Sequence, residues 1–307
     1  MAEEYIPIKK SQVTYFRKIP LYYFSKDGEP LLYKQGGVPL DSSKSQSGKY
    51  PELFFHKSDK KEASKELHQT LNISLASAIS SKGIAAMKDL MGEIVEEALK
   101  DPFDFPLDKL PETLDLLFNG YSENKSLLGS LTLISSASSF LVEHTVNILS
   151  LTMQYCFFHD FAESDIKKLG ACAILHDIGL SDINQEILDA NDKEKLTDPQ
   201  FEQFKTHTLK GYKYIRSRST FEKEIAQVAL EHHEKLDGSG YPRGRTNISE
   251  EAQLIGLIDS YEYLAYRDKK FRQAQKPFGS LQILKKDVMA GKYNKEMFIN
   301  LCSCLTH

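Results

Sequence analysis

The sequence predicts a mainly α-helical chain that carries a small α+β unit at its N terminus. Up to about residue 60, short aromatic and aliphatic runs alternate with glycine-containing turns, a pattern typical of strands. From about Glu62 onward, apolar residues recur at spacings of three and four, which favours amphipathic helices. Beyond Pro111 few stretches have strand character. The chain has 307 residues, more than one typical domain, so we expect two units.

The first unit, residues 1–65, is predicted to contain a strand, a turn and a second strand. IPLYYFS and LLYKQGGVPL flank a turn at Asp27-Gly28, and LFFHKSD offers a further strand. Residues 41–49 are polar and have little to bury, so we expect a loop there. The unit shows no recognisable phosphoacceptor or nucleotide-binding motif, and we expect it to be regulatory or dimerising.

Residues 66–125 are predicted to form a helical linker or dimerisation region. The segment from His68 to Lys100 has the periodicity of amphipathic helices. Asp101-Pro102 and Phe105-Pro106 then break the run. A homodimer follows if these helices pair between chains, but core packing within one chain explains the same periodicity.

Residues 126–307 are predicted to fold as successive helices. Asp198 offers an N-cap followed by Pro199 at the first helical position. Ser249 offers another N-cap, and two acids follow it in the first turn of EEAQLIGLIDSYEYLAY.

Charge and hydropathy exclude two broad classes of protein. The net charge of −4 does not suggest the basic face of a general nucleic-acid binder. The start, MAEEYIPIKK, lacks the pattern of a secretory signal. The best candidate for a membrane span, Ser126 to Val142, carries six serines and is too polar. We therefore expect a cytoplasmic protein that binds neither nucleic acid nor membrane.

Five histidines and two aspartates stand out as candidate metal ligands. Imidazole binds zinc, iron and manganese-type ions, and a carboxylate can bridge two cations through its two oxygens. Taken singly, each residue has a structural explanation as well. The set is His144, His176, Asp177, His207, His232, His233 and Asp259.

Two features of this set favour a shared centre. His232 and His233 are adjacent, and adjacent helical residues diverge by about 100°, so both reach one cluster only near a helix end or through different ring nitrogens. Asp259 interrupts the apolar run AQLIGLID, where an unpaired buried carboxylate would be costly. A metal ion or an N-terminal cap could satisfy it.

The ordered motifs resemble the HD-GYP branch of the HD phosphohydrolases. HHEKLDGSGYP is close to the HHExxDGxGYP string of that branch, and the resemblance spans roughly Leu127 to Leu301. It implies an all-helical HD-domain bundle. It also implies a signalling phosphodiesterase that hydrolyses cyclic di-GMP to pGpG or GMP, through a hydroxide that bridges two metal ions.

The resemblance implies a ligand set for two metal ions. His144, His176, Asp177 and Asp259 would hold one ion, and Asp177 would bridge to a second held by His207, His232 and His233. His176 and Asp177 would thus be the catalytic pair. Some family members hold a third metal through a glutamate four residues before the first histidine, but Phe140 stands there, so we expect two ions. Ligands without thiolate favour iron, with manganese and zinc as alternatives.

Several positions depart from the family pattern. Leu180 follows HDIG where the family has a phosphate-binding lysine, a loss of about 1.5–3 kcal/mol of interaction. Gln253 replaces a nearby arginine. Phosphate recognition would then fall to Lys269 and Arg272, which are otherwise solvated surface residues.

The loop that carries Gly238, Gly240, Tyr241 and Pro242, the GYP loop, has two interpretations. We predict that Gly240 and Tyr241 contact the substrate; the alternative is a structural turn beside the metals. The family also links this loop with recognition of a signalling partner protein.

Two other functions stay open. A receptor that has lost hydrolysis but still binds a cyclic dinucleotide or a partner would explain Leu180 and the altered segment from Tyr266 to Arg272. A different nucleotide substrate would make the same changes a matter of specificity.

Overall fold

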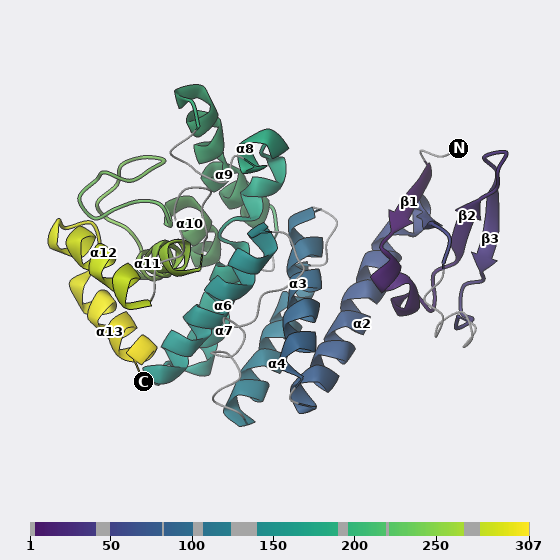
Figure 1. Cartoon of the computed structure of the whole chain (residues 1–307), viewed down its shortest axis with the longest axis horizontal. Coiled ribbons are helices and arrows are strands. Elements are labelled where there is room, and N and C mark those ends of the chain that lie inside the picture. The colour runs from purple at the N-terminus through teal and green to yellow at the C-terminus, as the bar shows by residue number, and fades with distance from the viewer. Residues whose placement is uncertain are drawn as a thin grey trace.

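The computed structural model describes residues 4–40, 50–81, 83–100, 107–123, 140–189, 196–218, 221–266 and 277–306. These residues form mostly helices together with one four-stranded sheet, which confirms the predicted fold class. Figure 1 shows the sheet at one end of an elongated molecule and the last two helices at the other. Buried residues from Ile8 to Cys304 belong to one hydrophobic core cluster.

The N-terminal sheet is antiparallel, with the strand order β1-β4-β2-β3. The predicted strand–turn–strand is the β2–β3 hairpin, whose turn places Gly28 at a φ of 79°. The predicted further strand is β4. The strands are β1 (Tyr5–Ile8), β2 (Leu21–Phe24), β3 (Pro30–Lys34) and β4 (Leu53–His56), with 3-10 turns η2 (Lys10–Tyr15) and η3 (Lys57–Asp59).

Three helices join the sheet to the C-terminal bundle: α2 (Lys60–Ser80), α3 (Ile84–Lys100) and α4 (Leu110–Glu123), the last preceded by η4 (Leu107–Lys109). Helix α2 packs on α3 and α4, while α3 and α4 pack in turn on helices of the bundle. The apolar faces predicted from periodicity are thus buried within one chain. A homodimer and the division at residues 65 and 125 stay predictions.

The C-terminal bundle begins with α6 (Phe140–Phe158) and α7 (Glu163–Leu175), followed by η5 (Ile178–Asp182) and α8 (Gln185–Asp189). It continues with α9 (Asp198–Arg216), α10 (Lys223–Glu231), α11 (Glu250–Ala265), α12 (Pro277–Met289) and α13 (Lys295–Thr306). Ser249 caps α11 as predicted, since its hydroxyl accepts a hydrogen bond from the N–H of Ala252. The cap predicted at Asp198 is wrong by one residue. Thr197 is the N-cap, because its side chain and that of Gln200 form a capping box.

Within the described residues, no helix combines the length and the hydropathy needed to cross a lipid bilayer. Most of the stretch from Ser126 to Val142 lies outside these residues, since the description resumes at Phe140.

Candidate metal centre

The end of helix α7 presents His176 and Asp177. Residues 169–175 of this helix are buried throughout, so the chain delivers both side chains from a rigid support into the interior. His176 forms the C-cap, and its Nδ1 lies 2.7 Å from the carbonyl oxygen of Ala173. This hydrogen bond places the ring proton on Nδ1 and leaves Nε2 as a ligand atom.

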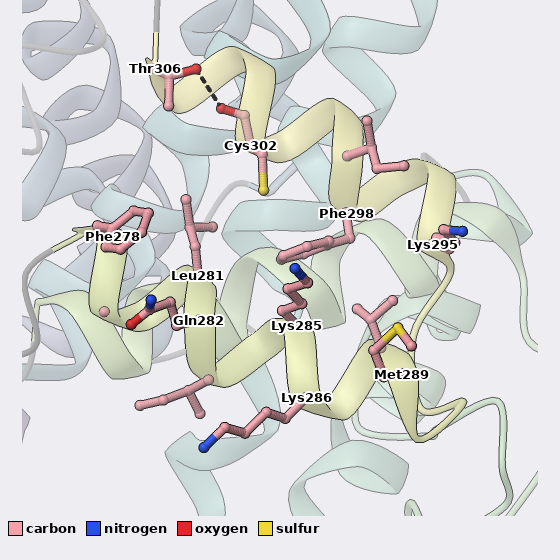
Figure 2. Close-up of a pocket in the computed structure, with 14 residues that line it drawn as sticks. Phe278, Leu281, Gln282, Lys285, Lys286, Met289, Lys295, Phe298, Cys302 and Thr306 are labelled. Carbon is pink, nitrogen blue, oxygen red and sulfur yellow. Dashed lines mark hydrogen bonds between the residues drawn. The ribbon is translucent and has the colours of Figure 1, made fainter.

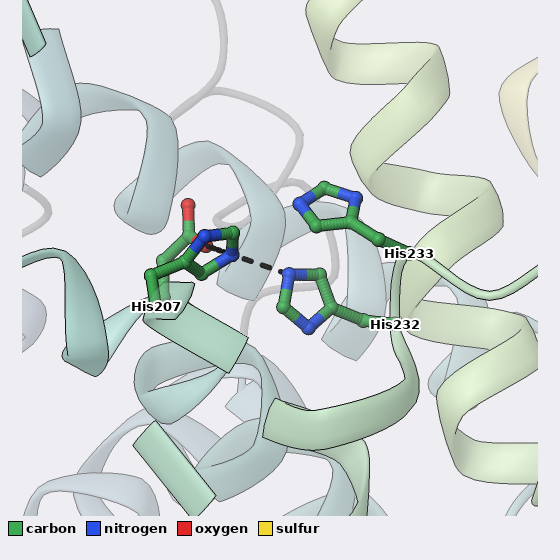
Figure 3. A group of neighbouring side chains, drawn as sticks. His207, His232 and His233 are labelled. Atoms are coloured by element: carbon green, nitrogen blue, oxygen red, sulfur yellow. Dashed lines mark ion pairs between the residues drawn. The ribbon is translucent and has the colours of Figure 1, made fainter. Parts of the chain in front are cut away.

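His207 and His232 are oriented in the same way, by a hydrogen bond from Nδ1 to a backbone carbonyl oxygen. Nδ1 of His207, on α9, lies 2.7 Å from the carbonyl oxygen of Phe204. Helix α10 ends at Glu231, and His232 is its C-cap, with Nδ1 3.1 Å from the carbonyl oxygen of Ala229. The adjacent His232 and His233 therefore stand at a helix end, the arrangement that their divergence required. Figure 3 shows the three rings gathered from α9 and the end of α10.

Asp177 lies between two groups of histidines. Its Oδ1 is 3.3 Å from Nε2 of His207 and 3.4 Å from Nε2 of His232. Its Oδ2 is 3.5 Å from Nε2 of His176 and 3.7 Å from Nε2 of His144. Each carboxylate oxygen thus faces a different pair of imidazoles, which is the geometry of a bridging ligand.

Asp259, on helix α11, joins the first group, that of His144 and His176. Its Oδ1 lies 3.4 Å from Nε2 of His144, and its Oδ2 lies 3.7 Å from Nδ1 of His233. In each group, every residue offers a ligand atom within 4.8 Å of the others. The groups are His144, His176 and Asp259, and Asp177, His207, His232 and His233.

Burial and unsatisfied atoms test whether these residues fit metal ions. Three buried atoms of the candidate ligands have no hydrogen-bond partner within the part of the chain that the structure describes: Asp177 Oδ1, His207 Nε2 and His232 Nε2. Such orphaned atoms are costly unless something binds them. All three point to one place, and metal ligation is the chemistry that suits neutral imidazole and carboxylate together. The residues fit.

Ionisation states agree with ligation. Burial lowers the pKa of His176 to about 4, so the ring is neutral at physiological pH. Burial opposes ionisation of Asp177, but the surrounding imidazoles of His176, His207 and His232 outweigh it and hold the pKa of this carboxyl well below its usual value. The neutral ring of His176 and the ionised carboxylate of Asp177 are the forms that bind metal.

Sequence reasoning missed two residues that support His144. Nδ1 of His144 lies 2.7 Å from Oε2 of Glu262, and Oε1 of Glu262 accepts a 3.0 Å hydrogen bond from Nδ2 of Asn147. Both residues are buried. The signal was spacing, because Asn147 and Glu262 each follow a candidate ligand by three residues, which puts them on the same helical face.

Two glycines set how closely the ligand-bearing segments approach. A Cβ on Gly179 would lie 2.0 Å from the carbonyl oxygen of His207, and a Cβ on Gly256 would lie 2.2 Å from that of His232. Any side chain at either position would therefore push a ligand away from the centre.

The GYP loop lies directly over the second group. Glu234 accepts hydrogen bonds from the backbone N–H of Arg243 at 2.7 Å and of Arg245 at 2.9 Å, which holds the loop in place. Gly240 lies against the backbone of His233 and has no room for a side chain. The Tyr241 ring lies 4.6 Å from the His233 ring, centre to centre. Its hydroxyl is buried, and no described residue forms a hydrogen bond with it.

The departures from the family pattern have different fates. Leu180 is 4% exposed and packs in a small apolar cluster with Ile183, Ile187 and Phe204, next to Tyr241. The amide nitrogen of Gln253 donates to the carbonyl of Ile248 at 2.8 Å. Lys269 and Arg272 lie outside the described residues.

A hollow lies away from the histidine cluster, between helices α12 and α13. It has a volume of about 1190 Å³ and contains no predicted site residue. Figure 2 shows Phe278, Leu281 and Phe298 lining it, with Lys285, Lys286 and Lys295 among its other residues. Its size alone does not make it the active site, because the groups able to do chemistry lie at the histidine cluster.

A family model described as "HD domain" matches residues 131–297, which is more than half of the chain. The chain belongs to the HD domain family. The family predicted from the sequence is thus confirmed, and it implies binding of divalent metal ions.

Similar proteins include a "Cyclic di-GMP phosphodiesterase PdeB" from Borreliella burgdorferi, 32% identical over 155 residues, which are 49% of this chain and 39% of that protein. A "3'3'-cGAMP-specific phosphodiesterase 3" from Vibrio cholerae is 27% identical over 158 residues, 51% of this chain and 34% of that protein. The chain therefore spans less than half the length of both.

Among solved structures, Bd1817, an HDG"Y"P protein from Bdellovibrio bacteriovorus, has the same fold. The match covers 99% of this chain and 100% of that chain, with a TM-score of 0.65 and 16% sequence identity. The shared fold includes the N-terminal sheet as well as the HD bundle.

Proposed function

We propose that this chain is a metal-dependent phosphodiesterase of cyclic dinucleotides, with cyclic di-GMP as its substrate. The observation that carries the proposal is the position of Asp177, whose two oxygens face separate groups of buried imidazoles. Two cations held a few ångströms apart are a common device for hydrolysing phosphodiesters.

Each group would hold one ion. His144, His176 and Asp259 would hold the first together with Oδ2 of Asp177, and His207, His232 and His233 would hold the second together with its Oδ1. Bound cations would supply an activated water as nucleophile and neutralise charge on the phosphoryl oxygens. The nitrogen and oxygen donors suit iron, with manganese and zinc as alternatives.

The protein's own contribution is orientation. Hydrogen bonds from Nδ1 of His176, His207 and His232 to backbone carbonyls fix each ring, so the ligand atoms need not reorganise when metal and substrate bind. The catalytic role that we assign to His176 and Asp177 would be to hold the metal ions in a fixed position.

Tyr241 supplies a donor beside the second group. Burial raises the pKa of its phenol well above the usual value, with the charges of Asp177 and Asp259 adding to the effect, so the hydroxyl keeps its proton. Because that hydroxyl has no hydrogen-bond partner among the described residues, we take it to be available to donate to a phosphoryl oxygen of the substrate. Lys269 and Arg272 would provide the cationic contacts that Leu180 does not.

The substrate class is supported by the relatives. One is named for cyclic di-GMP and another for 3'3'-cGAMP, and both substrates contain the same 3′–5′ phosphodiester. The second candidate function is therefore hydrolysis of 3'3'-cGAMP. The buried Leu180 favours a third reading, a receptor that binds the nucleotide without cleaving it.

A hydrolysis assay separates these functions. Metal-loaded protein is incubated with cyclic di-GMP and with 3'3'-cGAMP, and linear products are quantified. Hydrolysis of cyclic di-GMP that disappears in Asp177→Ala and persists in Asp182→Asn supports the proposal. Asp182 is a suitable control because it lies on the adjacent η5 turn, is exposed, and bonds Tyr214 outside both groups. Nucleotide binding without product would support the receptor instead.

A further inference from the structure

Helix α3 carries a lysine that is almost completely buried. Lys88 is 1% exposed, and Met91, one helical turn further on the same face, is fully buried, as is the adjacent Met87. A buried ammonium group is costly unless polar partners surround it. Nζ of Lys88 lies 3.4 Å from Oδ1 of Asn147 and 3.5 Å from Oε1 of Glu143, both on α6.

These contacts continue to the metal centre. The amide nitrogen of Asn147 donates to Oε1 of Glu262, and Oε2 of Glu262 lies 2.7 Å from Nδ1 of His144. Lys88, Asn147, Glu262 and His144 are all 3% exposed or less, so no bulk water competes for their hydrogen bonds. The series links α3, α6 and α11 in three steps.

The charge of Lys88 fixes the direction of every step. An ammonium group can only donate, so it selects the carbonyl end of the Asn147 amide. The NH₂ end must then point to Glu262, whose second oxygen accepts the proton of His144 Nδ1. With its proton held on Nδ1, His144 presents the lone pair of Nε2 toward the first group of ligands.

We propose that Lys88 is a positioning residue for the ligand His144, acting through Asn147 and Glu262, so that helix α3 is a functional part of the metal centre. This inference rests on the proposed metal-dependent function. Helix α3 precedes the segment that matches the HD domain, residues 131–297, and it contacts both α6 and the η5 turn that follows Asp177.

The test replaces Lys88 by methionine, which keeps an unbranched apolar stem and removes the terminal ammonium group. The matched control is Lys34→Met. Lys34 is also buried, at 5% exposure, but its Nζ bonds the carbonyl oxygens of Arg17, Gln35 and Val38 in the N-terminal sheet, away from the metal centre. Both variants are made in the 307-residue chain, and thermal unfolding establishes that each is folded.

The readout is metal affinity, measured by titrating metal-free protein with Mn²⁺ against a chelating competitor. We expect Lys88→Met to weaken one of the two binding steps by about tenfold, the lower end for loss of a ligand's supporting partner. The other step is expected to be unchanged, as are both steps in Lys34→Met. In an Asn147→Leu background, Lys88→Met is expected to have no further effect, because the intermediate step is already missing.

A second readout needs no metal. ¹⁵N NMR of the imidazole of His144 is expected to show a single Nδ1–H tautomer in the wild-type protein and a mixture in Lys88→Met. If folded Lys88→Met bound both ions as tightly as the wild type and kept the wild-type tautomer of His144, the positioning role would be overturned. Those results would leave the proposed function standing, whereas a metal-loaded wild type without hydrolysis would overturn only the proposed function.

Discussion

Replacing Gly179 by alanine tests whether the close crossing of η5 and α9 sets the position of His207. The new Cβ would lie 2.0 Å from the carbonyl oxygen of His207 and 2.5 Å from the backbone nitrogen of Gly211. Ordinary contact begins at 3.4 Å, so the crossing must widen by the difference from 2.0 Å, about 1.4 Å. Both obstacles are backbone atoms, which cannot turn aside as a flexible side chain could.

The expected cost is about 3 kcal/mol of unfolding free energy, the upper part of the usual range for overpacking. Displacing a ligand by more than 1 Å also disturbs the geometry of the centre, and misplacement of this size lowers rates by about 100-fold. Urea unfolding measures the first effect, and hydrolysis of cyclic di-GMP measures the second.

The matched control is Gly211→Ala, on the α9 side of the same crossing. Its Cβ would meet no atom closer than 3.4 Å, and alanine is about 1 kcal/mol better than glycine within a helix, so we expect no loss of stability. A Gly179→Ala protein as stable and as active as this control would refute the reasoning that the glycine contact positions His207.

Further predictions concern the ligands, Leu180 and the thiols. Asp177→Ala is expected to abolish binding of both metal ions, and Asp259→Ala of only one, as measured by titration; equal losses would contradict a bridging role for Asp177. Saturating metal is expected to stabilise the wild type by about 2.7 kcal/mol per ion at 100 times Kd, and a chelator to reverse this in thermal unfolding. Leu180→Lys is expected to cost about 2 kcal/mol in urea unfolding, because it buries a charge in an apolar cluster; unchanged stability would place this side chain outside that cluster. Burial raises the pKa of Cys156 to about 12. At pH 8 a thiol reagent should therefore label the half-buried Cys302 first, and rapid labelling of Cys156 in folded protein would be inconsistent with its burial.

The sequence was sufficient for the fold class because its signals are local. Paired hydrophobic runs around Asp27-Gly28 predict the hairpin, and helical periodicity predicts the bundle. The N-cap of α9 was predicted one residue too late. Thr197 and Asp198 are both residue types that favour an N-cap, and only the capping box with Gln200 decides between them.

The candidate ligands were also visible in the sequence, but only as an ordered set recognised through family resemblance. Which oxygen of Asp177 faces which histidine is a property of the fold and could not be read from spacing. The contacts of Lys88 with the metal centre could not be predicted either, because they too depend on the fold. Lys88 lies 55 residues before its partner Glu143, and an isolated lysine in an amphipathic helix is expected to be solvated.

The interpretation of Leu180 also changed with the structure. Viewed from the sequence, it is a lost phosphate contact. In the fold it is part of an apolar cluster beneath Tyr241, so the change alters packing as well as charge.

The most direct test of the central claim is to locate the metal ions by anomalous diffraction from crystals of the metal-loaded protein. We expect two peaks per chain, one on each side of the Asp177 carboxylate. His144, His176 and Asp259 would surround one, and His207, His232 and His233 would surround the other. A single peak, or two peaks that do not share Asp177, would contradict that claim.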